Sequence, residues 1–129
     1  MEWHFNSDAP IYAQLVDQIT LRVVTAVYLP GQRLPSVREL AVEAGVNPNT
    51  MQRALAELER ENLVFSQRTS GRFVTEDIQM IEDAKRAIAA DRVENFLKAM
   101  DQLGFEKEEI LSLIQAAQTK EEETDGGNS

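Results

Sequence analysis

The segment from Leu29 to Arg53 restricts the fold more than any other part of the sequence. It is interrupted by Pro-Gly at 30–31, Pro-Ser at 35–36, a glycine at 45 and Asn-Pro at 47–48, and apolar residues recur at helical spacing between these breaks. Because proline and glycine mark the beginnings and ends of helices, the pattern predicts two short helices joined by a sharp turn. Such a helix-turn-helix is suited to placing its second helix in the major groove of DNA.

Local signals define the limits of these two helices. Ser36 and Glu39 have the spacing of a capping box, so the first helix is predicted to start there. Gly45 supplies the left-handed residue that ends it. Asn47 and Pro48 then act as the N-cap and the first residue of the second helix.

The second helix has one apolar side and one polar side. Its buried stripe is predicted to consist of Met51, Ala54, Leu55 and Leu58. A rotation of about 100° per residue leaves Gln52 on the flank and places a polar set on the opposite side, namely Asn49, Arg53, Ala56 and Arg60. Asn, Gln and Arg side chains are suited to reading the edges of bases. For Arg53, the alternative is an ion pair with Glu57, one helical turn further along.

Another helix is predicted ahead of this pair. Pro10 opens it, with Asp8 or Ala9 as its cap, and the Pro-Gly pair at 30–31 ends it. Its apolar stripe consists of Tyr12, Leu15, Val16, Ile19, Val23, Ala26 and Val27. Before it, Trp3 and Phe5 alternate with polar residues, which indicates an extended arm that packs on the domain or on a partner.

Residues 63–65 and 72–74 are short strand candidates, and residues 67–71 join them as a hairpin loop in which Gly71 supplies a positive φ. A hairpin directly after a recognition helix is the wing of a winged helix. Arg68 and Arg72 are predicted at the tip and the base of this wing. Contact with the DNA backbone or minor groove is one reading of these arginines, and a role in solubility alone is the alternative.

The remaining sequence changes character after residue 76. Residues 78–104 and 106–118 have helical apolar patterns, and residues 119–129 are polar and acidic, which predicts a disordered tail. About 40 residues are too few for an independent core, so the two helices must pack on the first domain, on a second copy, or on both. We favour a homodimer, because helix-turn-helix proteins commonly dock as two-fold pairs. The predicted dimer contacts are Ile81, Ile88, Phe96, Leu97, Met100, Leu103, Ile110 and Ile114.

Charge is distributed unevenly along the 129 residues. The net charge is −9, which argues against a general nucleic-acid coat, yet residues 33–72 carry six arginines against five glutamates. Residues 78–129 carry six basic and twelve acidic side chains. The absence of cysteine excludes disulfides and fits the cytoplasm. No signal peptide or apolar run long enough to span a membrane occurs, so no membrane contact is predicted.

Many spaced residues within positions 9–75 resemble the N-terminal domain of GntR-type bacterial transcription regulators. The resemblance rests on Pro10-Ile11-Tyr12, Gln14-Leu15, Pro30-Gly31, Arg33-Leu34-Pro35-Ser36, Arg38, Leu40-Ala41, Gly45-Val46-Asn47, Thr50, Ala54 and Gly71-Arg72-Phe73-Val74. The short two-helix C-terminal segment resembles the YtrA subfamily. That resemblance implies a homodimer joined through the C-terminal helices and frequent control of neighbouring transporter operons.

The resemblance also implies DNA contacts at particular positions. Arg38 is expected on a phosphate or a guanine, and the early recognition-helix positions fall on residues 47–50 and on Gln52. Some relatives have arginine where this chain has Pro48 and Gln52, which implies a different operator. Ser70 precedes Gly71 where relatives usually carry two glycines, which implies a wing tip less free to approach the minor groove.

Taken together, the sequence predicts a mainly α fold with a small β-hairpin wing: a winged helix-turn-helix over residues 1–76, a two-helix dimerisation segment over 77–118 and a disordered tail over 119–129. We predict a repressor that binds a palindromic operator as a homodimer. The predicted DNA contacts are Ser36, Arg38, Asn47, Pro48, Asn49, Thr50, Gln52, Arg53, Arg68 and Arg72.

Other functional classes receive less support from the sequence. No phosphate-binding loop, nucleophile elbow or metal motif occurs, so no enzymatic activity, cofactor or metal is predicted. Two alternatives stay open. The acidic net charge favours a winged-helix module that binds proteins, and the C-terminal helices offer a place for an unidentified small-molecule effector in a sensor.

Overall fold

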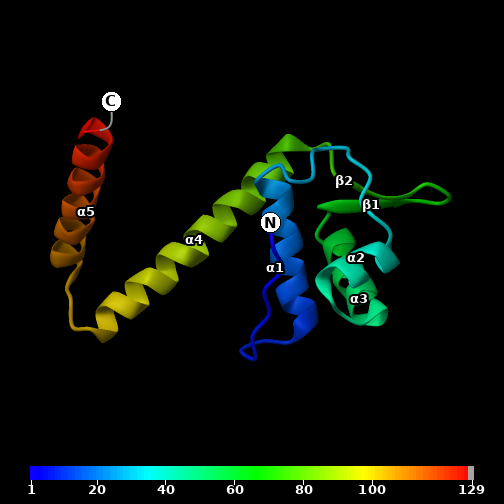
Figure 1. The fold of residues 1–129 in the computed structure, drawn as a ribbon, viewed down its shortest axis with the longest axis horizontal. Coiled ribbons are helices and arrows are strands. Elements are labelled where there is room, and N and C mark those ends of the chain that lie inside the picture. Colours follow the sequence, from blue (N-terminus) through cyan, green and yellow to red (C-terminus); the bar gives the residue numbers. More distant parts are fainter. Residues whose placement is uncertain (128–129) are drawn as a thin grey trace. The chain divides into compact units, whose positions relative to one another are not determined.

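Five helices and one β-hairpin make up the part of the chain that the structure describes. The computed structural model describes the backbone of residues 1–127 and the side chains of residues 1–122. In chain order the elements are α1 (Ile11–Val24), α2 (Val37–Ala44), α3 (Pro48–Arg60), β1 (Val64–Gln67), β2 (Gly71–Val74), α4 (Ile78–Gln102) and α5 (Lys107–Gly127) (Figure 1). This order confirms the predicted fold class, a mainly helical chain with a hairpin wing after its third helix.

The chain divides into two compact units, residues 1–87 and residues 88–129, and α4 passes from the first into the second. The sequence predicts a boundary after residue 76, but the first turns of α4 belong to the first unit. Ile81 is buried in the core of that unit, and Met80 and Ala84 pack against it. The prediction that Ile81 lies in a dimer interface is therefore wrong, because its side chain is already buried within its own chain.

The core of the first unit lies where α3 packs against α1 and α2. Its most deeply buried side chains come from all three helices and from the hairpin: Leu15, Ile19, Val23, Leu40, Met51, Ala54, Leu55, Leu58, Val64 and Val74. Burying one large aliphatic side chain stabilises the fold by about 1.5–3 kcal/mol relative to leaving it exposed. The stripe predicted for α3 is confirmed, and its burial fixes how α3 is rotated about its own axis.

α1 begins one residue later than the sequence predicts. Pro10 is its N-cap and not its first residue, and no side chain caps the helix, so neither Asp8 nor Ala9 has that role. The reason is that the backbone before the helix is held by other contacts. The side-chain amide of Gln14 donates to the carbonyl of Ala9 at 2.7 Å and to the carbonyl of Asn6 at 2.9 Å.

α1 also ends earlier than predicted, at Val24 and not at the Pro-Gly pair. Ala26 adopts a left-handed conformation with φ of 61°. The N–H groups of Val27 and Tyr28 then both donate to the carbonyl of Arg22, at 2.8 and 3.1 Å. This turn buries Tyr28 and leaves Ala26 and Val27 exposed, although the sequence places both in the apolar stripe. The β-branched residues at 23–25 favour such an early end, since they are weak helix formers.

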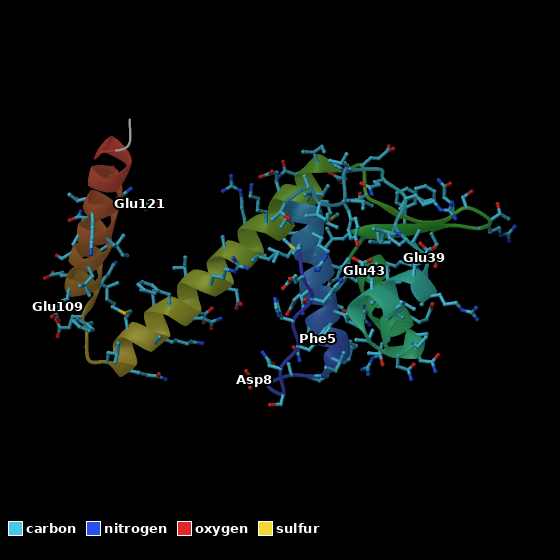
Figure 2. The ribbon with its side chains drawn as sticks, in the orientation of Figure 1. Phe5, Asp8, Glu39, Glu43, Glu109 and Glu121 are labelled. Atoms are coloured by element: carbon cyan, nitrogen blue, oxygen red, sulfur yellow. The ribbon has the colours of Figure 1, made fainter. Side chains whose placement is uncertain are left out.

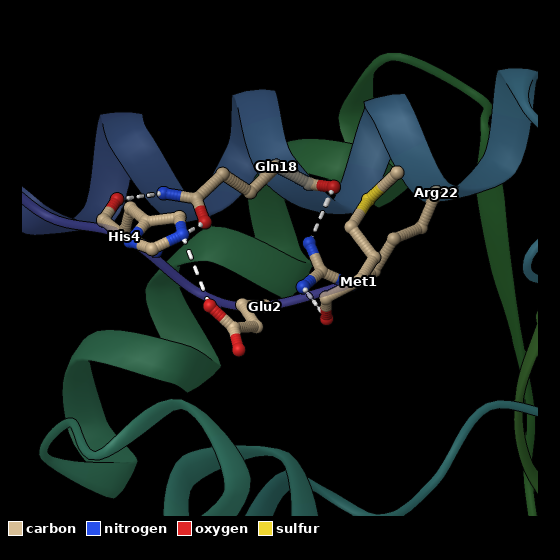
Figure 3. Close-up of polar contacts among 5 residues, drawn as sticks. All are labelled: Met1, Glu2, His4, Gln18 and Arg22. Atoms are coloured by element: carbon tan, nitrogen blue, oxygen red, sulfur yellow. Dashed lines mark hydrogen bonds and ion pairs between the residues drawn. The ribbon is translucent and has the colours of Figure 1, made fainter.

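Two glutamines of α1 hold the extended N-terminal arm, residues 1–9. Gln18 accepts the N–H of His4 at 3.1 Å and donates to its carbonyl at 2.6 Å (Figure 3). Gln14 does the same for Asn6, at 3.0 and 2.9 Å. Residues four apart share one face of a helix, and residues two apart share one side of an extended chain. The two side-chain amides therefore pair with alternate residues of the arm, as a neighbouring strand does in a sheet.

Arg22 is the third member of this row on α1, and only 2% of its surface is exposed. Its guanidinium donates to the carbonyl of Met1 and to the carbonyl of Gln18, each at 3.0 Å (Figure 3). The guanidinium carbon also lies 3.6 Å from the centroid of the Trp3 ring. Burial lowers the pKa of Arg22, and the nearby Tyr28 and Glu43 act in the opposite direction. Arg22 therefore joins the start of the chain to the core.

The aromatic residues of the arm pack on the first unit. Trp3 and Phe5 are half-buried against the core. The indole N–H of Trp3 donates to Glu43 of α2 at 3.4 Å, and Figure 2 shows Phe5 beside α1 and Glu43 on α2. Of the two predicted positions for the arm, the structure shows the one on its own domain.

In the second unit, α4 ends at Gln102, and Gly104 takes the left-handed conformation with φ of 90° that commonly follows a helix. α5 begins shortly afterwards at Lys107. Ile110 is buried within its own chain, which corrects its prediction as a dimer contact. None of the helices within residues 1–127 has the length and apolar character needed to cross a membrane.

α5 continues to Gly127, where the sequence predicts a disordered tail from Thr119 onward. The lysine and glutamate residues at the start of this stretch have high helix propensity. The Thr119 hydroxyl also donates to the carbonyl of Gln115 at 3.0 Å. Glu109 and Glu121 lie on this helix (Figure 2). Residues 128–129 of the predicted tail lie outside the described residues.

We predict that Arg22→Ala lowers the free energy of unfolding by about 2 kcal/mol, because it removes a buried side chain and leaves the carbonyl of Met1 without its donor. Urea denaturation measures this change. The matched control is Arg86→Ala, which removes an exposed arginine of α4 in the same unit. Equal midpoints for the two variants would contradict a structural role for Arg22.

Candidate nucleic-acid interface

The start of α2 presents one arginine to solvent. The Ser36 hydroxyl accepts the backbone N–H of Glu39 at 3.1 Å, and Gly45 closes the helix with φ of 72°. Leu40 is fully buried, which directs the opposite side of the helix outward. Arg38 lies on that side and is exposed, and within the described residues its guanidinium has no hydrogen bond or ion pair. Arg38 is therefore available to an external anion.

The start of α3 is fixed by its own residues. The side chain of Asn47 accepts the N–H of Asn49 at 2.8 Å, and Pro48 occupies the first helical position, as predicted. Because the stripe beginning at Met51 is buried, the first two turns direct their polar residues outward. The predicted reading residues are exposed apart from Thr50, which is half-buried: Asn47, Pro48, Asn49, Gln52 and Arg53. The first unit leaves this side of α3 uncovered, as reading a DNA groove requires.

Arg53 has a partner that the sequence does not reveal. Its guanidinium carbon lies 3.6 Å from the centroid of the Tyr12 ring in α1. The ion pair with Glu57, which is the alternative weighed from the sequence, does not form. Glu57 pairs with Arg60 instead. Helical spacing places Tyr12 in the apolar stripe of α1, and nothing in that spacing identifies a cationic partner on another helix.

The wing is an antiparallel hairpin of β1 and β2 in which Phe65 pairs with Phe73. The two rings stack with centroids 5.6 Å apart. The segment before α2 runs along the other edge of β2, where the N–H of Leu34 donates to the carbonyl of Arg72 at 2.8 Å. Figure 1 shows the hairpin extending beyond α2 and α3. The hairpin is confirmed, but its strands are longer than predicted, because Gln67 and Gly71, which the sequence places in the loop, pair with each other at the strand ends.

The two predicted arginines of the wing have different surroundings. Arg68 lies in the exposed turn, and the described residues give its guanidinium no partner. The Arg72 side chain is only 20% exposed, and its Nε lies 2.6 Å from Glu59 Oε1 near the end of α3. The Ser66 hydroxyl of β1 donates to the same oxygen. Arg72 therefore joins the wing to the recognition helix, and sequence spacing alone does not reveal this pair.

A further exposed arginine, Arg33, lies beside the wing and is absent from the predicted set. It forms an isolated antiparallel bridge with Phe73, and its Nε would lie 3.2 Å from a Cβ added at Gly71. Glycine is favoured at position 71 because its φ of 97° is strained for residues with a side chain. Only the fold brings Arg33 next to the wing, since the segment before α2 pairs with β2.

The carboxylate of Glu59 accepts both polar contacts that join α3 to the wing. Burial favours its neutral form, but the hydrogen bonds from Ser66 and Arg72 and the charge of Arg72 outweigh that cost, so the pKa of Glu59 is lowered. Because the pKa of Glu59 is lower in the folded state than in the unfolded state, the ionised carboxylate stabilises the fold. This stabilisation is fully present above the ordinary glutamate pKa. This stability is lost as the pH falls through the lowered value.

We predict that Glu59→Gln lowers the free energy of unfolding at neutral pH by about 1 kcal/mol, because a charged acceptor is lost. The difference from the unsubstituted protein should shrink as the pH falls through the lowered pKa. Urea denaturation over a pH series measures it. Glu82→Gln, at an exposed position of α4, is the control and should keep the pH profile of the unsubstituted protein. A difference that stays constant with pH contradicts the electrostatic contribution.

The part of the chain that matches a known protein family has nearly the same bounds as the winged helix. Residues 11–74, from the start of α1 to the end of β2, match the family described as "Bacterial regulatory proteins, gntR family". The chain is 43% identical over 114 residues to the HTH-type transcriptional regulator YhcF of Bacillus subtilis (strain 168), with 88% of this chain and 94% of YhcF covered. The chain belongs to the GntR family. This GntR-family chain is also 31% identical over 106 residues to the HTH-type transcriptional repressor YtrA of the same organism, with 81% of this chain and 82% of YtrA covered.

Solved structures agree with this assignment. A GntR family transcriptional regulator from Listeria monocytogenes matches with a TM-score of 0.80 and 42% identity, covering 87% of this chain and 98% of that one. The DNA-binding domain of AraR, solved in complex with the operator ORX1, matches with a TM-score of 0.54 and 29% identity over 58% of this chain and 96% of that domain. The predicted resemblance is confirmed, and this GntR-family chain is a DNA-binding transcription regulator.

Proposed function

We propose that this GntR-family regulator is a repressor that binds a palindromic operator as a homodimer, with the first turns of α3 in the major groove. The observation that carries the proposal is the uncovered polar side of α3, opposite a fully buried stripe. Asn49, Gln52 and Arg53 read base edges in this proposal, because amide and guanidinium groups match the hydrogen-bonding patterns of the major groove. The likeness to the AraR domain, which is solved with operator DNA, supports it.

Phosphate contacts position the helix on the duplex. We assign them to Arg38 at the start of α2 and to Thr50 in the first turn of α3. Ser36 and the first backbone N–H groups of α2 assist them, because a helix N-terminus attracts anions. Arg68 at the wing tip contacts the backbone or the minor groove. To Arg72, which Glu59 holds, we assign the role of fixing the wing in place of the predicted DNA contact.

Repression is supported by the similarity to YtrA, which is described as a repressor. A protein seated in the major groove of an operator blocks transcription when that operator overlaps a promoter. The resemblance to the YtrA subfamily further implies a neighbouring transporter operon as the target. Transcripts of the adjacent genes should rise when the gene for this chain is deleted.

We predict that Arg38→Ala weakens binding to all duplexes by a similar factor and reduces the slope of log affinity against log salt by about 1, because one phosphate contact is lost. Fluorescence anisotropy over a salt series, with an operator selected from random DNA, measures both. Arg86→Ala removes the same charge from an exposed site on α4 and should leave the slope unchanged. A flat salt response of the unsubstituted protein would favour the alternative class, a module that binds proteins.

The homodimer is proposed from the apolar surface of the second unit. Along α4 and the residue that follows it, positions spaced by three and four form a stripe of Val93, Phe96, Met100 and Leu103, and all but the half-buried Met100 are exposed. α5 adds exposed Leu111, Leu113 and Ile114. Contiguous apolar surface of this kind usually marks an interaction site. A second copy of the same unit covers it, with Ile88, Phe96, Leu97, Met100, Leu103 and Ile114 as its proposed contacts.

We predict that Phe96→Asp converts the dimer to a monomer, because the Phe96 side chain, 42% exposed in one chain, would bring a carboxylate into an apolar interface. Sedimentation velocity measures the mass. Lys98→Asp adds the same group to the opposite side of α4 and should stay dimeric. If Phe96→Asp and Met100→Asp both remain dimers, the interface lies elsewhere.

A further inference from the structure

One contact between α1 and α3 lies within the proposed reading surface. Tyr12 in the first turn of α1 is half-buried, whereas Arg53 in the middle of α3 is exposed. The guanidinium carbon of Arg53 lies 3.6 Å from the centroid of the Tyr12 ring. At that distance the flat face of the guanidinium rests on the ring, which leaves the N–H groups at its edges for other acceptors. Within the described residues, these N–H groups form no hydrogen bond.

The position of the stack fits a role in reading DNA. Arg53 follows Asn49 by one helical turn, so the two side chains share the uncovered side of α3. Tyr12 and Arg53 together separate two shallow depressions on this surface. The first is lined also by Pro10, Ile11, Asn49 and Thr50, and the second also by Ala56, Glu57 and Arg60. The contact between Tyr12 and Arg53 therefore borders both depressions, on the side of α3 that the proposal places in the groove.

Among the residues that the structure describes, no carboxylate pairs with Arg53. The residue with the correct spacing, Glu57, is paired with Arg60. The orientation of Arg53 is thus set by a neutral ring. A carboxylate partner would have to be displaced before the guanidinium could bind an acceptor on DNA, whereas the face of a ring can remain in contact while the edges bind.

We propose that Tyr12 is a positioning residue that orders Arg53 for its contact with the operator. This inference rests on the proposed reading role of α3. An arginine side chain that is free in solution loses rotamer entropy when it binds, and stacking on Tyr12 removes much of that loss in advance. The edge of Arg53 then meets guanine O6 and N7, the acceptors that guanidinium groups bind most often. Tyr12 itself makes no DNA contact.

A double-mutant cycle on operator binding tests this role. The four proteins are the unsubstituted chain, Tyr12→Leu, Arg53→Ala and the double variant, and the DNA is an operator selected from random duplexes by the unsubstituted chain. Arg53→Ala should weaken binding about ten-fold. Tyr12→Leu should weaken it about two- to five-fold, which corresponds to one exposed cation–π contact. The double variant should bind no more weakly than Arg53→Ala alone, since Tyr12 acts only through Arg53.

Tyr12→Phe is the matched control, because it keeps the ring and removes the hydroxyl. It should bind as the unsubstituted chain does, and a loss equal to that of Tyr12→Leu shows a hydroxyl contact and overturns the inference. Thermal melting verifies the fold of each variant. If Tyr12→Leu is destabilised, Tyr12→Met, with an unbranched apolar side chain, replaces it in the cycle.

The remaining outcomes separate the inference from the function on which it rests. Independent, multiplicative losses in the cycle overturn the positioning role of Tyr12 and leave the reading role of Arg53 intact. An unchanged affinity of Arg53→Ala overturns the reading role and the inference with it. In the last outcome, Arg53→Ala loses the same factor of affinity on the selected operator and on a duplex altered at the contacted guanine. That result assigns Arg53 to a phosphate contact, and Tyr12 then positions Arg53 for that contact.

Discussion

The packing of α3 against α1 determines which of its side chains reach solvent. Because Met51, Leu55 and Leu58 are buried in this contact, the helix cannot rotate about its axis without exposing apolar surface. The side that carries Asn49 and Arg53 is left uncovered as a direct result. The surface that we propose meets DNA is thus a consequence of core packing, and no separate interaction is needed to direct these residues outward.

The two ends of α3 have different structural roles. Its first turn is fixed by Asn47 and Pro48, because the side chain and the carbonyl of Asn47 accept the first N–H groups of the helix. Near its last turn, Glu59 binds Arg72 and Ser66 and so holds the wing. One helix therefore determines the positions of both parts of the winged helix that we propose contact DNA. The wing can be repositioned only by breaking a charged, partly buried contact.

One face of α1 binds the N-terminal arm and so adds it to the first unit. Gln14, Gln18 and Arg22 hold the arm through its backbone groups, so the arm is retained by side chains of one helix and not by a sheet. Arg22 is an exception to the usual exposure of arginine, and its burial is tolerated because two carbonyls and the ring of Trp3 surround its guanidinium. The arm thereby becomes part of the same packed unit as α1 and α2.

The amino-acid sequence was enough to predict the helix-turn-helix, because the capping residue Ser36, the glycine at 45 and the Asn-Pro pair at 47–48 each act on a few neighbouring residues. It also determined the buried stripe of α3, since helical spacing is a local property. The tertiary structure alone decided the partners of Arg53 and Arg72 and the burial of Ile81, because each depends on a residue brought close by packing. Local signals give the positions of helices, whereas contacts between distant residues select which charged groups remain free.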